Sequence, residues 1–168
     1  MSSLNNGSIR SALLDDAPAI LEAYKASDSF SSLHARENQI SLLDVLDWLE
    51  NASDKHPLLV FEYDSRVVAW CSVEPFYGLP AFDSASEVSL YVLPDWQGFG
   101  VGQRLLNYVQ EQKKHLALTH LLAYVYGNNT KSKIFFEKQG FAVWGYLPNI
   151  ARGPSACGDV CLYGLQLD

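Results

Sequence analysis

The sequence predicts an α/β fold in which helices cover both faces of a mixed sheet. Three observations lead to this prediction: the first half of the chain contains a hairpin pattern, the second half alternates strands with helices, and the composition is globular. The chain has 168 residues, of which 48% are hydrophobic and 18% charged. Because this is about the length of one domain and no repeat divides it, we expect a single domain over residues 1–168.

Two helices are expected before the hairpin. Asp16 is placed to cap the first helix, with Pro18 in its first turn. The apolar side of this helix consists of Ile20, Leu21 and Tyr24. The second helix begins at Ser41, with Asp44 three residues later as the partner of a capping box. Its core-facing side consists of Leu42, Val45, Leu46 and Leu49.

The hairpin and a third strand follow. Residues 58–63 and 67–73 are predicted as strands joined by the turn pair Asp64-Ser65, and residues 87–93 as a strand that Pro94 ends. Apolar residues then recur at helical spacing from residue 100 to about 116. A strand over 121–126, a short helix over 130–139 ended by Gly140, and strands over 141–146 and 160–167 complete the chain.

The charge balance narrows the class of partner. Lys and Arg number 12 against 19 Asp and Glu, which gives a net charge of −7 and a pI near 5.0. An acidic surface disfavours a nucleic-acid partner, because phosphate backbones bind basic surfaces. No apolar run is long enough to span a bilayer and no signal-peptide pattern is visible, so we expect no membrane partner.

Cysteine and histidine usage predicts neither disulfides nor a metal site. Cys71, Cys157 and Cys161 are odd in number and form no CxxC pair, so we expect reduced thiols in a cytoplasmic protein. The four histidines are scattered without ligand spacing.

A glycine-rich segment lies between a predicted strand and a predicted helix, with glycines at 98, 100 and 102. Such a turn lets backbone N–H groups converge on an anion at a helix N-terminus, and a pyrophosphate is the natural ligand. No Lys-Ser or Lys-Thr follows, which disfavours a P-loop triphosphatase, and the spacing is not the GxGxxG of a Rossmann site. The alternative is a turn that only permits close packing.

Two motifs resemble the signatures of the GCN5-related N-acetyltransferase (GNAT) superfamily. Gln97-Gly-Phe-Gly100-Val-Gly102, after Tyr91-Val92-x-Pro94, resembles the acetyl-CoA signature Gln/Arg-x-x-Gly-x-Gly/Ala. The second motif is Asn129-Thr-Lys-Ser132 followed by Phe135-Phe136-Glu-Lys-Gln-Gly140-Phe141. Glu87, Gly145-Tyr146-Leu147-Pro148 and Gly158-Asp159-Val160 are similar to the phosphinothricin and L-amino-acid N-acetyltransferase branch. The resemblance is clear from about residue 58 onward and rests on helix pattern before it.

This resemblance implies a GNAT fold, with a mixed, mostly antiparallel sheet of six to seven strands. It implies direct acetyl transfer from acetyl-CoA, in a ternary complex, to the primary amine of a small molecule, above all an amino acid or analogue such as phosphinothricin or methionine sulfoximine. It also implies a homodimer. The residues it assigns to acetyl-CoA are Leu90, Tyr91, Val92, Gln97, Gly98, Phe99, Gly100, Val101, Gly102, Asn129 and Ser132.

Acetyl transfer to an amine needs a base, a polarised carbonyl and a protonated leaving thiolate. Glu87 is the candidate base, since it shares a strand face with Ser89 and Tyr91; the alternative is a solvated strand residue. The backbone N–H of Leu90 or Val92 is expected to polarise the thioester carbonyl. Asn129 either reaches the CoA arm or caps a helix.

The proton donor and the acceptor site are less defined. Phe135 and Phe136 occupy positions where the family often has a Tyr or His donor, and Tyr126 and Tyr146 are nearby phenols, so no acid is assigned. The acceptor-binding residues expected are Phe76, Tyr77, Glu87 and Arg152, where an arginine could clamp a carboxylate, as could Arg36. The alternatives are that both arginines are ordinary surface residues and that Phe76 and Tyr77 only end a strand.

Two other functions stay open. A protein or peptide N-acetyltransferase would use the same chemistry, and the acidic surface would suit a basic peptide. A non-catalytic acyl-CoA-binding module would keep the glycine turn without turnover, and the phenylalanines at the donor positions leave room for it.

Overall fold

Seven strands form one sheet in the order β1-β2-β3-β4-β5-β7-β6 in the computed structural model, which describes residues 4–27, 40–152 and 157–168. The strands are β1 (Gly7–Ser11), β2 (Leu58–Tyr63), β3 (Arg66–Pro75), β4 (Ala85–Val92), β5 (His120–Tyr126), β6 (Ala142–Arg152) and β7 (Cys157–Gln166). Neighbouring strands are antiparallel except β4 and β5, which are parallel. The predicted mixed, mostly antiparallel sheet is therefore confirmed.

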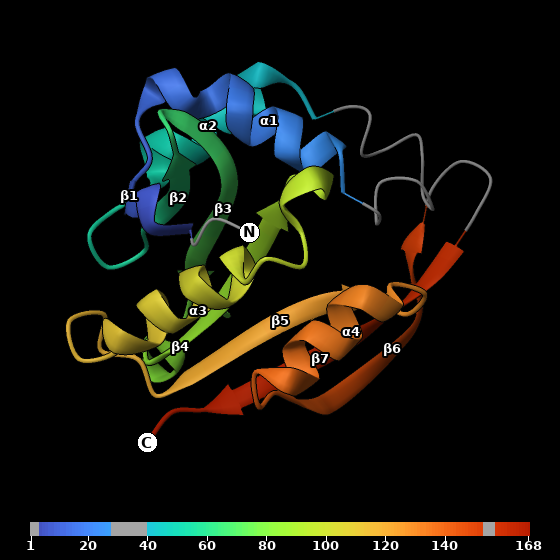
Figure 1. The fold of residues 1–168 in the computed structure, drawn as a ribbon. Coiled ribbons are helices and arrows are strands. Elements are labelled where there is room, and N and C mark those ends of the chain that lie inside the picture. Colours follow the sequence, from blue (N-terminus) through green and yellow to red (C-terminus); the bar gives the residue numbers. More distant parts are fainter. Residues whose placement is uncertain (1–3, 28–39, 153–156) are drawn as a thin grey trace.

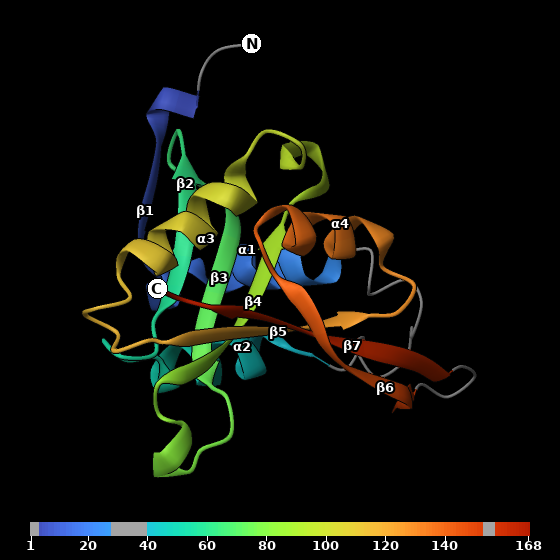
Figure 2. The same ribbon diagram turned by 90° about the horizontal axis from the view of Figure 1, so that it is seen from below.

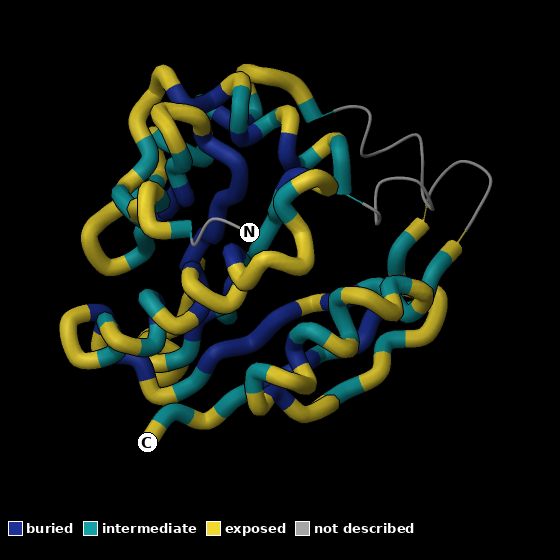
Figure 3. The backbone as a smooth tube through the Cα atoms, viewed as in Figure 1, coloured by how far each residue is buried: buried dark blue, intermediate teal, exposed yellow. Residues whose placement is uncertain are grey.

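Helices lie on both faces of this sheet, as predicted. They are α1 (Ala17–Lys25), α2 (Leu42–Asn51), α3 (Val101–Glu111) and α4 (Thr130–Lys138). Helices α1 and α2 pack on one face of the β1–β4 portion, and α3 lies on the other face beside α4 (Figures 1 and 2). The buried residues follow the central strands and the inner sides of the helices (Figure 3), because these are the surfaces that the two layers remove from water.

The β2–β3 hairpin has the turn that the sequence predicts. Asp64 and Ser65 have φ values of 47° and 64°, so both central residues are left-handed. Two such residues match the twist of the flanking strands, which is the reason two-residue hairpins use this turn. The prediction from the pair Asp64-Ser65 is confirmed.

Several boundaries differ from the prediction. Strand β1 is missed by the sequence analysis, because its five residues contain a single large apolar side chain, Ile9. Helix α3 ends at Glu111, about five residues early, in a series of turns that reach Ala117 at φ 54°. Strand β6 continues past the predicted end to Arg152, across a register shift between Leu147 and Ala151.

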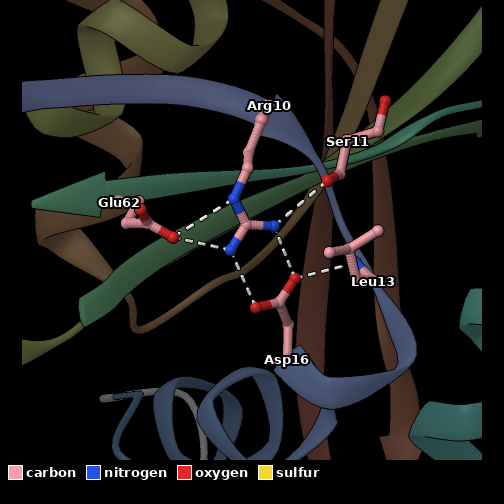
Figure 4. A network of polar contacts seen from close by, with 5 residues as sticks. All are labelled: Arg10, Ser11, Leu13, Asp16 and Glu62. Atoms are coloured by element: carbon pink, nitrogen blue, oxygen red, sulfur yellow. Dashed lines mark hydrogen bonds and ion pairs between the residues drawn. The ribbon is translucent and has the colours of Figure 1, made fainter. Parts of the chain in front are cut away.

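The predicted capping box of α2 is confirmed, whereas for α1 the predicted cap position is confirmed without the capping bond. Asp16 occupies the cap position, but its side chain forms no cap hydrogen bond. Its carboxylate instead accepts from the guanidinium of Arg10 and the backbone N–H of Leu13 (Figure 4). In α2, the Asp44 carboxylate accepts from the backbone N–H of Ser41 at 2.7 Å, as the capping box requires.

Candidate active site

Strand β4 pairs with β5 over only part of its length. The parallel register contains three residue pairs, Ala85 with His120, Ser86 with Leu121 and Glu87 with Leu122. Beyond Glu87, β4 continues to Val92 and β5 to Tyr126, but the two strands no longer pair with each other and they diverge (Figure 1). The sheet therefore begins to open at Glu87, the residue predicted to be the base.

The backbone of β4 alternates between the β3 side and the open side. Phe76 N–H donates to the carbonyl of Ala85, and Leu93 N–H donates to the carbonyl of Val68. Residues at odd positions of β4 therefore direct their backbone groups to β3, and the even positions direct theirs to the opening. It follows that the N–H groups of Leu90 and Val92 face the divergence between β4 and β5.

The glycine turn lies next to this opening. Gly98 and Gly100 have φ values of 81° and 82°, a left-handed conformation that favours glycine, and Gly100 is the N-cap of α3. A Cβ built on either glycine meets no atom within 4 Å. The turn thus has free space outside it and the first N–H groups of α3 at its end, which fits the diphosphate of a bound coenzyme.

The other residues of the turn hold it in place. A Cβ on Gly102 would lie 3.2 Å from Leu90 and 3.3 Å from Phe135, so this glycine permits close packing of α3 against β4 and α4. The Gln97 side chain donates from Nε2 to the carbonyl of Val92 at 3.0 Å. Val101 is buried and Phe99 is exposed, so Val101 can meet a ligand only through its backbone.

Asn129 is the N-cap of α4. Its Oδ1 accepts from the backbone N–H of Ser132 at 3.1 Å. The capping alternative is thus correct for the Oδ1 atom. The amide nitrogen of Asn129 has no role in this bond, so a contact with a CoA arm stays a prediction.

A cavity of about 190 Å³ lies between helices α1 and α2 and strands β2, β3 and β4. It is lined by Tyr24, Trp48, Leu58, Trp70, Ser72, Glu74, Ser89 and Tyr91. Ligand pockets for drug-sized molecules span roughly 300–1,000 Å³. This cavity therefore suits a small acceptor.

Four aromatic rings form a closed set of contacts around the cavity. The Trp70 and Tyr91 rings stack at 4.7 Å, and Tyr24 lies 5.2 Å from Tyr91. Trp48 completes the set, 5.8 Å from Tyr24 and 5.9 Å from Trp70. The Trp70 indole N–H also donates to the carbonyl of Ile20 at 3.1 Å, which fixes its orientation.

Glu87 is half-buried and stands opposite Glu74 of β3 in the antiparallel register. Burial raises the pKa of the Glu87 carboxyl, and the charge of Glu74 raises it further. A carboxylate with a raised pKa is a stronger proton acceptor, which is what a base for an ammonium group requires.

None of the four predicted acceptor residues lines this cavity, although Glu87 stands opposite the lining residue Glu74. The rings of Phe76 and Tyr77 pack against Phe82, at 6.4 and 5.1 Å. Arg152 ends β6 opposite Cys157 and is exposed. Arg36 lies outside the described residues.

Glu74 and the helix residues Tyr24 and Trp48 are parts of the site that were not predicted from the sequence. Tyr24 and Trp48 carry helical periodicity and give no other signal. A charged residue that interrupts the apolar strand β3 was the one available sign of Glu74.

The fold and the site are those of an acyltransferase. Residues 18–141 match the acetyltransferase (GNAT) family, and the chain belongs to this family. YwnH of Bacillus subtilis, provisionally named a phosphinothricin acetyltransferase, is 33% identical over 90% of this chain and 94% of its own. The L-amino acid N-acyltransferase MnaT of Escherichia coli is 26% identical over 96% of this chain and 94% of its own.

A similar solved structure contains the co-substrate acetyl-CoA. The Salmonella typhimurium acetyltransferase yncA, with its cofactor acetyl-CoA, superimposes with a TM-score of 0.84 at 25% identity, covering 98% of this chain and 95% of that chain. This chain, like its family, is therefore an acetyltransferase that uses acetyl-CoA, as its motifs predict. In the described residues, no helix has the length and apolarity to cross a membrane, and no three His, Cys, Asp or Glu side chains group as metal ligands would.

Proposed function

We propose that this enzyme acetylates the primary amine of a small amino acid or an analogue of the phosphinothricin or methionine sulfoximine type. The observation that carries the proposal is the small aromatic cavity beside the opened strand β4, with the Glu87 carboxylate on the same strand face. The names of YwnH and MnaT support an acceptor of this class. Arg152, Phe76 and Tyr77 are proposed to contact the acceptor from outside the cavity lining.

Acetyl-CoA supplies an acetyl thioester when it is bound. The backbone of the turn from Gln97 to Gly102 is proposed to hold the diphosphate, with Asn129 and Ser132 nearby on α4. The N–H groups of Leu90 and Val92 face the opening, so they can donate to the thioester oxygen, where negative charge develops.

Glu87 is proposed to take a proton from the acceptor's ammonium group, which leaves the nitrogen lone pair free to attack. The leaving sulfur then needs a proton, and Tyr124 is a phenol in a suitable place. It lies two residues beyond Leu122, the last residue of β5 that pairs with β4, and it is 45% exposed. Burial raises the pKa of Tyr124, and the charge of Glu87 raises it further. A phenol that stays protonated can donate to a thiolate.

A homodimer and a cytoplasmic location are also proposed. Strand β6, at the edge of the sheet, exposes the large apolar side chains of Val143, Trp144, Tyr146 and Ile150. Exposed apolar patches mark interaction sites, and a second copy is the simplest occupant of a sheet edge. Sedimentation velocity tests the dimer.

All three cysteines are free, which supports a reducing compartment such as the cytoplasm.

The test of the activity is a thiol-release assay with acetyl-CoA and a panel of amines. Turnover with free amino acids, phosphinothricin and methionine sulfoximine supports the proposal. Turnover with peptides alone indicates a peptide N-acetyltransferase instead. Coenzyme binding without thiol release from any amine contradicts the proposal and indicates a binding module.

A further inference from the structure

Two glutamates stand side by side at the acceptor cavity. Glu74 and Glu87 are directly opposite one another on β3 and β4, so their side chains project from the same face of the sheet. Glu74 lines the cavity, and the next pair along the two strands on this face, Ser72 with Ser89, lines it as well. Like charges in directly opposite positions destabilise a sheet. Such a pair is therefore costly unless a cation joins it.

No protein cation neutralises this pair in the described part of the chain. Neither carboxylate takes part in an ion pair or in a side-chain hydrogen bond there. The ionisable groups that interact with Glu87 are Glu74 on β3 and Tyr124 on β5, and the cavity lined by Glu74 also contains Tyr91 on β4 and Tyr24 on α1. Farther out, the His56 imidazole interacts electrostatically with Glu74. The two carboxylates thus lie between an aromatic wall and solvent with their negative charge uncompensated.

We propose that Glu74 is a positioning residue for the acceptor amine: it attracts the ammonium group into the place between the two carboxylates and makes Glu87 the stronger base. This inference rests on the proposed function and deepens it. The acceptor enters as R–NH₃⁺, the form that dominates at neutral pH. Aromatic faces on the cavity wall also favour a cation.

The proton balance assigns a separate part to each carboxylate. R–NH₃⁺ transfers one proton to the Glu87 carboxylate and becomes R–NH₂, whose lone pair forms the new C–N bond as the C–S bond of the thioester breaks. The thiolate sulfur takes the proton proposed to come from Tyr124, and the second proton lost by the nitrogen restores that phenol. Glu87 then releases the proton to solvent. Glu74 is the exposed member of the pair; it takes no part in the proton transfer and attracts the ammonium group through charge.

The experiment compares E74Q and E87Q, with E111Q as the control. Glu111 is an exposed glutamate at the end of α3, away from the cavity. The first measurement is an NMR titration of ¹³C-labelled glutamate carboxyls in the free enzyme, which needs no turnover. We expect E74Q to lower the titration midpoint of Glu87 and E111Q to leave it unchanged.

The second measurement is kcat/KM against pH with the best amine of the panel. We expect E74Q to move the acidic limb to lower pH and to raise the acceptor KM by about two- to fivefold, the range for one exposed charge pair. We expect E87Q to lower kcat itself. A Glu87 midpoint and an acceptor KM in E74Q that equal those of E111Q overturn the inference. If wild type acetylates no amine, the proposed function fails, while the NMR titration still decides whether Glu74 acts on Glu87.

Discussion

Arg10 donates from Nη1 and Nη2 to the two carboxylate oxygens of Asp16, at 2.7 and 2.9 Å. The same guanidinium reaches Glu62 of β2 at 2.7 Å (Figure 4), so this arginine ties the start of α1 to the edge of the sheet. Asp16 is 9% exposed, and its partners lower the pKa of its carboxyl although burial acts to raise it. The bond to Arg10 is the largest cause of that lowering.

Asp16→Asn is expected to reduce the free energy of unfolding at pH 7 by about 2 kcal/mol, the size of a hydrogen bond to a charged group. Since the folded pKa of Asp16 is lowered, its contribution is present above the unfolded pKa of about 3.9 and is lost as the pH falls through the folded value. Urea unfolding from pH 7 downward tests this. The gap between wild type and variant closes in acid, whereas the exposed neighbour in Asp15→Asn shows little change at any pH.

Gly100→Ala is expected to weaken acetyl-CoA binding at least tenfold, and Gly100→Val to abolish it. Both side chains would fill the open space outside the turn, and the φ of 82° adds backbone strain of about 1 kcal/mol. Gly140→Ala is the matched control, since Gly140 has a φ of 91° at the end of α4. Calorimetry with acetyl-CoA separates the effects: unchanged affinity in folded Gly100→Val contradicts the proposed diphosphate site.

Glu87→Gln is expected to lower the rate by about 10²-fold, as removal of a general base does. The loss falls mainly at acidic to neutral pH, where little free amine exists without a base. Because burial and Glu74 raise the pKa of Glu87, the wild-type kcat/KM declines toward acid through a pKa above that of an ordinary glutamate. A variant with the wild-type pH–rate profile removes Glu87 from the mechanism.

Tyr124→Phe is expected to lower kcat by about 10²-fold with little effect on the acceptor KM, because the phenol acts on the leaving thiolate. Tyr146→Phe is the control, since the Tyr146 hydroxyl donates to Asp159 on the β6–β7 hairpin. Steady-state kinetics of both variants decide the matter. Equal kcat values in the two variants show that water or another group donates this proton.

Gly164→Ala is expected to destabilise the fold by about 1–3 kcal/mol, the usual cost of an overpacked site. A Cβ at Gly164 would lie 1.9 Å from the Trp144 ring, so the indole would have to leave its place over β7. Gly145→Ala is the matched control, because its Cβ meets Leu162 at an ordinary 3.6 Å. Thermal unfolding of the pair measures the difference, and equal midpoints would show that Trp144 moves without cost.

The parts of the site that are local in sequence were predictable. The turn from Gln97 to Gly102 is predictable because glycine is the residue that adopts a left-handed conformation at no steric cost, and Gly98 and Gly100 both do so. The β2–β3 hairpin and the capping box at Ser41 are likewise decided by residues within four positions of one another.

The acceptor cavity was not predictable in the same way. Its walls come from two helices and three strands, and the meeting of Tyr24 with Tyr91 depends on how α1 packs on the sheet. The pairing of Glu74 with Glu87 depends on the register between β3 and β4, which a shift of one residue would destroy. The packing of Gly102 against Leu90 and Phe135 likewise depends on how α3 meets β4 and α4, which the motif alone does not indicate.

The divergence of β4 from β5 has a cost when acetyl-CoA is absent. Backbone donors and acceptors that neighbouring strands normally satisfy are left without strand partners along both inner edges. Unpaired strand edges are templates for association with other extended chains. Acetyl-CoA that fills the opening covers these edges. The enzyme with acetyl-CoA bound is therefore expected to resist aggregation during storage and heating better than the enzyme without it.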